Sequence, residues 1–167
     1  MIQINFNYED YKFSSINEKD VVELNEWIIN NGRESSSCTS LDPQILYRRF
    51  LEYYFTEDEV YLKINKANNM IGIFKGRIEE NSRFFIWLFI IDKELRNKGI
   101  GSKLLEELTS YLEQDKGIKD IRVGVAESNQ EAIAFWKRCY FKIDRISKNF
   151  FEGPNSQQED MIIMKRE

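Results

Sequence analysis

The residues FFIWLFIIDKELRNKGIGS, at positions 84–102, carry the strongest structural signal in this chain. The first eight are aromatic or aliphatic without interruption, which is typical of a strand buried on both faces. A short polar turn at 92–94 and a basic loop with glycines at 96–101 come next, and helical periodicity begins only after Gly101. The stretch therefore predicts a strand, a loop and a helix, in that order.

The loop between this strand and this helix combines glycines with positive charge. Gly99 and Gly101 allow the backbone to approach a ligand closely and to point successive N–H groups into one concavity. The start of the helix adds roughly half an elementary charge, and Arg96 and Lys98 add formal charge. We interpret the loop as an anion site, for a phosphate or pyrophosphate. It matches neither the dinucleotide fingerprint nor the P-loop, and the alternative is an ordinary turn with two solvated charges.

The composition predicts one folded domain that spans residues 1–167. Hydrophobic residues make up 42% of the chain and aromatic residues 14%, enough for a sizeable core. The formal net charge is −4, with Lys and Arg scattered along the chain, which argues against broad nucleic-acid binding. The longest apolar run, residues 84–91, is far shorter than the roughly 20 residues that cross a bilayer. We therefore expect no nucleic-acid partner and no membrane association.

Histidine is absent, and this removes whole classes of active site. Ser/His/Asp triads, Cys/His pairs and most zinc sites all need it, so no metal site is predicted. The two cysteines, Cys38 and Cys139, match no metal spacing and give no disulfide framework. The first residues, MIQINFNYEDYKF, lack the basic start and apolar block of a signal peptide. The expected compartment is the reducing cytoplasm.

Two helices are predicted ahead of residues 84–102. Asn17 followed by Asp20 forms a weak capping box, and the helix that it begins ends at Gly32. The apolar stripe of this helix consists of Val21, Leu24, Trp27 and Ile28. A second helix is predicted to start at Asp42-Pro43, because Asp is a good N-cap and Pro suits the first turn.

The remaining pattern alternates strands with helices. Further extended segments are predicted at 1–7, 11–16, 60–64, 70–78, 121–125, 141–147 and 161–164. A leucine-rich helix follows Gly101 and ends at Gly117, and another helix is capped by Asn129 or Ser128. The strand–helix–strand passage in the middle predicts an α/β fold with a partly parallel, mixed sheet and helices on its faces.

Two motifs in the second half resemble those of the GNAT acetyltransferase superfamily. The first is R-x-x-G-x-G between a strand and a helix, which stands here at 96–101. The second is an Asn at the start of the next helix, an Ala three residues on and then an aromatic pair, here Asn129, Ala132, Phe135 and Trp136. The resemblance implies a mostly antiparallel mixed sheet with a central parallel pair, about seven strands and four helices.

The resemblance also implies that acetyl-CoA binds as a co-substrate. Backbone groups at 89–91 would bond the pantetheine arm like an added strand, which requires their strand to part from its parallel neighbour. Backbone amides at 97–102 would hold the pyrophosphate. The residues expected at the cofactor are Phe89, Ile90, Ile91, Arg96, Asn97, Lys98, Gly99, Ile100, Gly101, Ser102, Asn129, Phe135 and Trp136. Two of them have simpler explanations, since Asn129 is also a good helix cap and Phe135 could belong to the core.

No catalytic residue is assigned from the sequence. Many family members place a Tyr second in the aromatic pair to protonate the leaving thiolate, but this chain has Trp136, whose indole N–H is no practical acid. The Gly that the family has before Phe141 is replaced by Tyr140. Members that act on ribosomal proteins often carry a Glu where this chain has Gly124. Gly124 predicts a bulge that splays the sheet, or room for an acceptor, and we favour the bulge.

Two carboxylates and one loop complete the candidates. Asp92 and Glu127 lie at strand ends near the expected site, where each could relay a proton through water or be a surface charge. By resemblance, the acceptor side is lined by residues 17–54, in which Arg33 and Glu34 could select a charged group or belong to a loop without a ligand. The acidic net charge mildly favours a cationic acceptor, such as a polyamine, an aminoglycoside or a peptide amine.

The functional expectation is an N-acetyltransferase that moves an acetyl group from acetyl-CoA to a primary amine of a small molecule or peptide. The amine would attack the thioester directly, with no covalent enzyme intermediate. One alternative is a CoA-binding module for sensing or interaction with weak catalysis. Another is a protein of the same fold without a cofactor. Monomer and homodimer both remain open.

Overall fold

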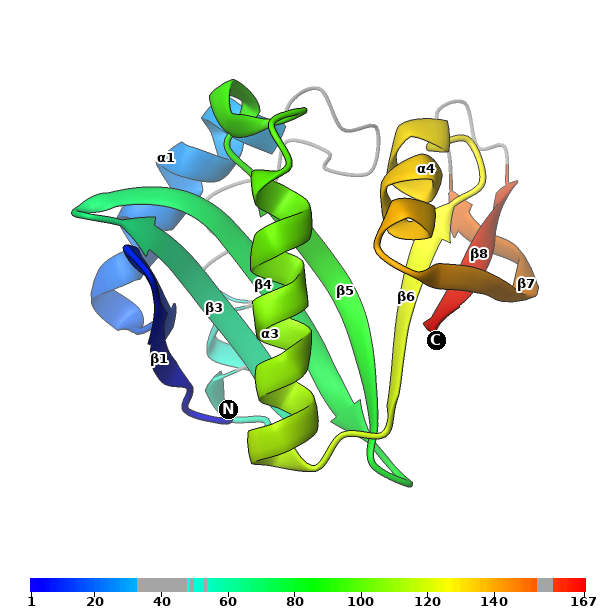
Figure 1. Cartoon of the computed structure of the whole chain (residues 1–167), viewed down its shortest axis with the longest axis horizontal. Coiled ribbons are helices and arrows are strands. Elements are labelled where there is room, and N and C mark those ends of the chain that lie inside the picture. Colours follow the sequence, from blue (N-terminus) through cyan, green and yellow to red (C-terminus); the bar gives the residue numbers. More distant parts are fainter. Residues whose placement is uncertain (33–47, 49, 53, 153–157) are drawn as a thin grey trace. The chain divides into compact units, whose positions relative to one another are not determined.

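The chain forms two compact units, each described here by itself (Figure 1). The computed structural model describes residues 1–32, 48, 50–52, 54–152 and 158–167. The first unit comprises Met1–Ile78 and Trp87–Lys98, and the second comprises Glu79–Ile86 and Gly99–Glu167. The strand β5 (Arg83–Ile91) therefore contributes its first half to the second unit and its second half to the first. The predicted helix start at Asp42-Pro43 lies outside the described residues.

The first unit is built on antiparallel strands that follow one another along the chain. They are β1 (Asn5–Tyr8), β2 (Tyr11–Ser15), β3 (Glu59–Lys66) and β4 (Asn69–Glu79). Each pairs with the next, and the extended segments predicted at 60–64 and 70–78 are confirmed as parts of the paired strands β3 and β4. Alternating side chains on these strands supply a fully buried core that includes Phe13, Leu62, Ile64 and Phe74.

The predicted helix after Asn17 is confirmed in its cap and in its buried face. Asn17 caps the short 3-10 helix η1 (Glu18–Asp20), which leads into α1 (Val21–Gly32). The Asn17 side chain accepts a hydrogen bond from Lys19 N, and Asp20 Oδ2 accepts one from Asn17 N at 2.9 Å, which completes the capping box. The residues that face the core are the predicted ones: Val21, Leu24, Trp27 and Ile28.

In the described residues of the second unit, three strands and two helices follow the first half of β5. They are α3 (Ile100–Lys116), β6 (Asp120–Ala126), α4 (Gln130–Arg138), β7 (Phe141–Glu152) and β8 (Gln158–Arg166). The leucine face of α3 is almost fully buried, and Gly117 ends the helix in the left-handed conformation, with φ +66°. The helix begins at Ile100, slightly before the predicted start after Gly101, because left-handed Gly99 forms its N-cap.

The hydrogen-bonded strand order is β1-β2-β3-β4-β5-β6-β8-β7. Within the second unit β5 and β6 are parallel, whereas β6 with β8 and β7 with β8 are antiparallel. The predicted mixed, mostly antiparallel sheet with a parallel pair is thus confirmed. In the part of the chain that the structure describes, the sheet has eight strands, close to the expected number of about seven. The four-residue β1 is the shortest of them and the least distinct in the sequence.

The prediction that residues 84–91 form a strand buried on both faces is only partly right. The flanks of the strand are buried, at Phe84, Phe85 and Ile86 and again at Ile90 and Ile91. Between them Trp87 keeps 44% of its surface exposed, although it belongs to the same apolar run. The parallel register with β6 ends at the pair Ile86–Val123, immediately before Trp87, so the burial of the run is interrupted where the pairing with β6 ends. An unbroken apolar sequence does not reveal where such a pairing ends.

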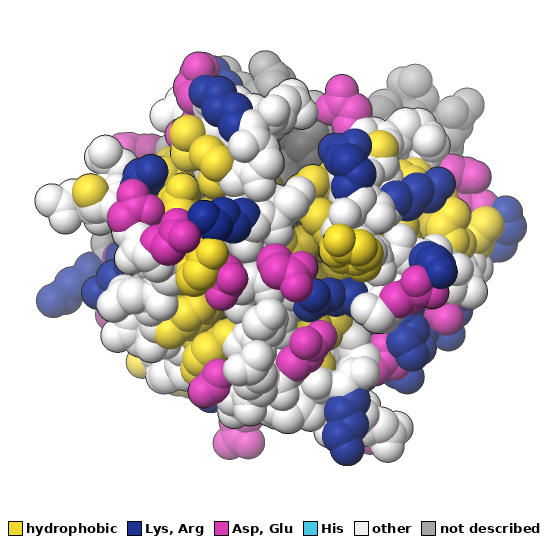
Figure 2. Space-filling view, in the orientation of Figure 1, with side chains coloured by type: hydrophobic (Ala, Val, Ile, Leu, Met, Phe, Trp, Pro, Cys, Tyr) yellow, Lys and Arg dark blue, Asp and Glu magenta, His cyan; other side chains and the backbone are white. Residues whose placement is uncertain are grey.

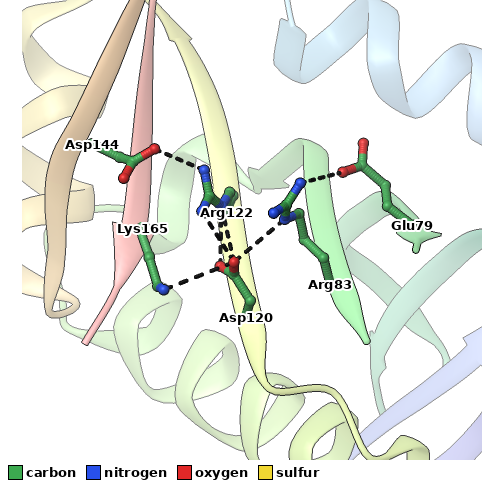
Figure 3. Close-up of polar contacts among 6 residues, drawn as sticks. All are labelled: Glu79, Arg83, Asp120, Arg122, Asp144 and Lys165. Carbon is green, nitrogen blue, oxygen red and sulfur yellow. Dashed lines mark hydrogen bonds and ion pairs between the residues drawn. The ribbon is translucent and has the colours of Figure 1, made fainter. Parts of the chain in front are cut away.

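A network of charged side chains lies where the parallel pair begins (Figure 3). Its members are Glu79, Arg83, Asp120, Arg122, Asp144 and Lys165. Asp120 is central: its carboxylate accepts hydrogen bonds from Arg122 Nη2 at 3.1 Å and from Arg83 Nε at 3.3 Å. Burial raises the pKa of Asp120, but these hydrogen bonds outweigh burial and leave the pKa below its usual value. The network therefore ties β5, β6 and β8 together.

Charges of both signs are interspersed over the face drawn in Figure 2, and the described residues in view form no continuous field of one sign. Among the residues that the structure describes, no helix has both the length and the apolar content to cross a bilayer. Within the same residues, no three or more Cys, Asp or Glu side chains gather in a way that could hold a metal ion.

Candidate functional site

The basic loop contains two residues with left-handed backbone. After β5, Asp92 caps the 3-10 helix η2 (Lys93–Leu95), with its Oδ1 accepting from Glu94 N at 2.9 Å. Asn97 has φ +59° and Gly99 has φ +77°. Left-handed residues next to a helix start turn successive N–H groups to one side, as an anion site requires. The predicted need for glycine is met at Gly99.

Gly101 differs from Gly99 in its backbone conformation. It lies in the first turn of α3, and the positive-φ glycines among the described residues are Gly99 and Gly117. Gly101 therefore needs no unusual backbone conformation. Its N–H belongs to the helix start together with those of Ile100 and Ser102, ahead of the first helical bond from Lys103 N to Gly99 O.

The two cations of the loop are both bonded to backbone carbonyls of the first unit. Arg96 Nε donates to Ile91 O at 3.0 Å, and its Nη2 donates to Asn31 O at 2.9 Å. Lys98 Nζ donates to Glu94 O at 2.7 Å, which folds this side chain back over η2. Both positive charges therefore lie at the loop. The Arg96 guanidinium is bonded to carbonyl oxygens of the protein itself.

The start of α3 fits a diphosphate. The helix is 17 residues long, its N-cap Gly99 has no side chain to bond the first N–H groups, and its first turn has no acidic residue. Free N–H groups and the helix dipole at such an end favour an anion. The N–H groups of residues 99–102 therefore form a helix start that is suited to an anion.

The end of β5 offers backbone groups in an alternating order. Asp92 N donates to Ile71 O on β4 at 2.8 Å, so Ile90, two residues earlier, also points its backbone groups toward β4. Gly72 of β4 admits this packing, because a Cβ there would lie 3.0 Å from Ile90 O. By alternation, Phe89 and Ile91 point their backbone groups to the opposite edge. On that edge, Ile91 O already accepts the hydrogen bond from Arg96 Nε.

The second motif lies at α4. Asn129 is the N-cap, with its Oδ1 accepting from Ala132 N at 3.1 Å, so its side chain has the structural use that the sequence left open. Trp136 is only 5% exposed and packs edge-on against Phe141, with ring centroids 5.0 Å apart. Phe135 is half-buried and contacts the Trp136 ring. The structure thus places Trp136 in the core of the second unit and leaves Phe135 partly accessible.

Tyr140 occupies a position that suits glycine. Its φ is +67° and 68% of its surface is exposed. We expect Tyr140→Gly to raise the free energy of unfolding by about 1 kcal/mol, because a left-handed conformation costs a non-glycine residue roughly that much. Urea unfolding measures the change. The matched control is Lys137→Gly. It also introduces a glycine, but inside α4, where it should lower the free energy of unfolding by about 1 kcal/mol. A loss of stability in Tyr140→Gly would contradict the strain.

The bulge predicted at Gly124 is wrong. The β6–β8 register runs without interruption through the pair Gly124–Ile163. Gly124 is instead a point of close packing, since a Cβ there would lie 2.6 Å from Met161 Sδ and 3.2 Å from Phe85 Cζ. Phe85, Met161 and Ile163 form a buried cluster on this part of the sheet. Side chains of the protein therefore fill the room that was considered for an acceptor.

This close packing makes Gly124→Ala a destabilising change. We expect it to lower the free energy of unfolding by about 1 kcal/mol, near the lower end of the usual cost of overpacking, because the flexible Met161 side chain can move. In a Met161→Ala background the same methyl group should cost clearly less, because only the approach to Phe85 Cζ at 3.2 Å remains. Chemical unfolding of the four proteins in this cycle measures the coupling. An equal cost in both backgrounds would show that Met161 is not the obstacle.

The two carboxylates considered as proton relays have different surroundings. Asp92 is occupied in capping η2, whereas Glu127 is exposed and follows β6, with its backbone N donating to Asp160 O at 3.0 Å. Sequence reasoning missed Asn31, which is 7% exposed and bonds the basic loop through both its side chain and its carbonyl. No local pattern marks it, because its partners are 62 and 65 residues away.

Comparison with known proteins agrees with this arrangement. The family described as "Acetyltransferase (GNAT) domain" matches residues 13–163. A Bacillus subtilis subsp. natto protein named "Probable spermine N(1)-acetyltransferase" is 34% identical over 77 residues, which is 45% of this chain and 51% of that protein. Among solved structures, the Vibrio cholerae spermidine N-acetyltransferase in complex with CoA and spermine has a TM-score of 0.78 at 18% identity, covering 95% of both chains.

A second solved structure has the same fold and a different named substrate. The ribosomal-protein-S5-alanine acetyltransferase from Vibrio fischeri has a TM-score of 0.78 at 16% identity, covering 98% of this chain and 96% of its own. At such low identity the likeness concerns the fold alone. The family match over residues 13–163 spans most of the sequence and includes both motifs. The chain belongs to the GNAT acetyltransferase family.

Proposed function

We propose that this protein is an acetyl-CoA-dependent N-acetyltransferase whose acceptor is a primary amine of a small molecule or peptide. The observation that carries the proposal is the start of α3, where left-handed Gly99 leads into a 17-residue helix with no acidic residue in its first turn. The family match supports the same activity. When bound, acetyl-CoA would supply an activated acetyl group as a thioester.

The residues of the chain would serve this reaction mainly by holding and orienting. The N–H groups at 99–102 would bind the diphosphate, and the backbone groups of Phe89 and Ile91 would align the pantetheine arm as an added strand. An amine with a pKa of about 9 is roughly 1% neutral at pH 7, a penalty of about 2.7 kcal/mol. A strong base is therefore not required, and we assign no catalytic residue.

The acceptor class is proposed no more finely than a primary amine. Relatives with similar folds are named for spermidine, spermine and ribosomal-protein alanine. Polyamines therefore come first in a substrate panel, followed by aminoglycosides and peptides with a free N-terminus.

The decisive experiment joins a binding measurement with a turnover measurement. Isothermal titration with acetyl-CoA should give binding in the micromolar range, and at a hundred times Kd the ligand should raise stability by about 2.7 kcal/mol. Thiol release with the amine panel, together with mass spectrometry of the acetylated product, should give multiple turnovers. No binding of acetyl-CoA would contradict the proposal.

A second candidate, a CoA-binding module without efficient catalysis, is favoured by Trp136. It stands where many relatives have a Tyr that protonates the thiolate, and it is only 5% exposed. Tight binding of acetyl-CoA with no turnover on any amine of the panel would favour this candidate. Multiple turnovers with any one amine would exclude it.

A further inference from the structure

Arg96, the first residue of the R-x-x-G-x-G motif, joins two separate parts of the first unit. Its Nε donates to Ile91 O at the end of β5 at 3.0 Å, and its Nη2 donates to Asn31 O near the end of α1 at 2.9 Å. The guanidinium has its donors in a fixed planar fork, so two bonds at once restrict both its position and its orientation. Arg96 therefore fixes the spacing between α1 and the beginning of the loop.

Asn31 bonds the same loop a second time. Its Oδ1 accepts from Lys93 N at 3.1 Å, while its Nδ2 donates to Trp27 O within α1 at 3.1 Å. Asn31 is 7% exposed, so these bonds are shielded from water and an unmade one would leave a buried polar group. We call the bonds Asn31 Oδ1 with Lys93 N, Asn31 O with Arg96 Nη2, and Ile91 O with Arg96 Nε the Asn31–Arg96 clamp.

The end of α1 needs such a partner. The last carbonyls of a helix have no partner within the helix, and a cation near them is favourable. The last turn of α1 has no basic residue of its own, so Arg96 supplies the charge from the loop. The helix is held from another side as well, because Trp27 Nε1 donates to Met70 O on β4 at 2.9 Å.

We propose that Asn31 and Arg96 are positioning residues, which hold the segment 92–98 against α1 and so preset the N–H groups that lead into α3. The inference rests on the proposed function, since it concerns the diphosphate site at residues 99–102. Lys98 is covalently joined to Gly99, so the direction in which the loop leaves η2 determines how the chain enters the site. Arg96 then acts through the backbone and need not contact a phosphate.

A positioning role of the Asn31–Arg96 clamp and a pure charge effect of Arg96 predict different affinities for acetyl-CoA. If Arg96 mattered only as a positive charge for the phosphates, removal of the uncharged Asn31 contact would leave the affinity for acetyl-CoA unchanged. If the clamp positions the loop, breaking the bond between Asn31 Oδ1 and Lys93 N from either end should weaken binding, although no charged contact to the ligand is lost.

Four variants separate the bond from its surroundings. Asn31→Ala removes the acceptor, and Lys93→Pro removes the N–H donor at the first position of η2, where proline is well tolerated. Lys93→Ala loses the same side-chain charge and keeps the N–H. Asn31→Asp keeps the acceptor oxygen for Lys93 N and loses the Nδ2 donor to Trp27 O, so it also controls for that second bond. Isothermal titration with acetyl-CoA measures Kd for each, and urea unfolding confirms that each is folded.

We expect Asn31→Ala and Lys93→Pro each to raise Kd roughly tenfold, the scale of one lost hydrogen bond. The double variant should be no weaker than the weaker single one, because both remove the same bond. Lys93→Ala and Asn31→Asp should stay within about twofold of the parent, and hydrogen exchange at Lys93 N should be fast only in Asn31→Ala. If one of the two bond-breaking variants does not fold, the other still gives the comparison with its control.

Two failures have different meanings. If the unaltered protein itself does not bind acetyl-CoA, the proposed function is wrong, and the positioning role of Asn31 and Arg96 is wrong with it. If the unaltered protein binds and the bond-breaking variants bind equally tightly, the positioning role is wrong while the proposed function stands.

Discussion

Replacement of Gly99 by glutamate should raise the Kd for acetyl-CoA at least a hundredfold while the protein remains folded. Gly99 has φ +77°, and a side chain there meets no heavy atom within 4 Å, so the cost to the fold is limited to about 1–2 kcal/mol of backbone strain. Its carboxylate would stand at the start of α3 and repel the diphosphate, and the strain would turn the N–H groups away. Isothermal titration measures the loss.

Gly117→Glu is the matched control for this change. Gly117 is also left-handed, with φ +66°, its surroundings are also open within 4 Å, and it lies at the opposite end of the same helix. The two variants should lose similar amounts of stability, but Gly117→Glu should bind acetyl-CoA as the parent does. Equal affinities in the two variants would mean that the helix start is not the site, as expected of a protein that shares the fold and binds no cofactor.

The largest loss of stability is expected from Asp120→Asn. Asp120 is bonded to Arg83 and Arg122 and lies 3.8 Å from Lys165, and its side chain is 17% exposed. The substitution keeps the size of the side chain but leaves three cations close together without their central carboxylate. Breaking such a partly buried network by removing one member costs about 3 kcal/mol. Urea unfolding at pH 7 measures this cost.

The acid side of the stability profile provides an independent check. Because the folded pKa of Asp120 is lowered, its contribution is present above the pKa of the unfolded chain and is lost as pH falls through the folded value. Stability of the parent should therefore fall more steeply below about pH 4 than that of Asp120→Asn.

Asp144→Asn, at the more exposed rim of the network, should cost less than about 1 kcal/mol. Equal costs for the two variants would contradict the central role of Asp120.

Local patterns in the sequence predicted the fold well where the signal is periodic or caps a helix. The capping box at Asn17, the stripe of α1, the leucines of α3 and the glycine that ends α3 each depend on residues a few positions apart. The order of strand, loop, helix and strand also follows from local pattern. The parallel pair at β5 and β6 was inferred from that order and is confirmed.

Features that depend on distant contacts were missed or predicted wrongly. Gly124 suggests a bulge in isolation, but the reason for its small size is Met161, which lies opposite it on another strand. The bonds of Arg96 to the carbonyls of Ile91 and Asn31 could not be foreseen from the motif in which it lies. Asn31 itself carries no local signal, since an Asn near a helix end is ordinary. Such roles follow from the packing of α1 on the loop. This packing joins residues that are far apart in the sequence, so no local pattern predicts it.

The central claim is that backbone N–H groups at residues 99–102 hold the diphosphate of CoA where α3 begins. A crystal structure of the protein with CoA tests it most directly. We predict phosphate oxygens at hydrogen-bond distance, about 2.7–3.2 Å, from these backbone nitrogens, with Asn31 and Arg96 still bonded to the loop. Clear density for the diphosphate at any other place on the protein would contradict this account.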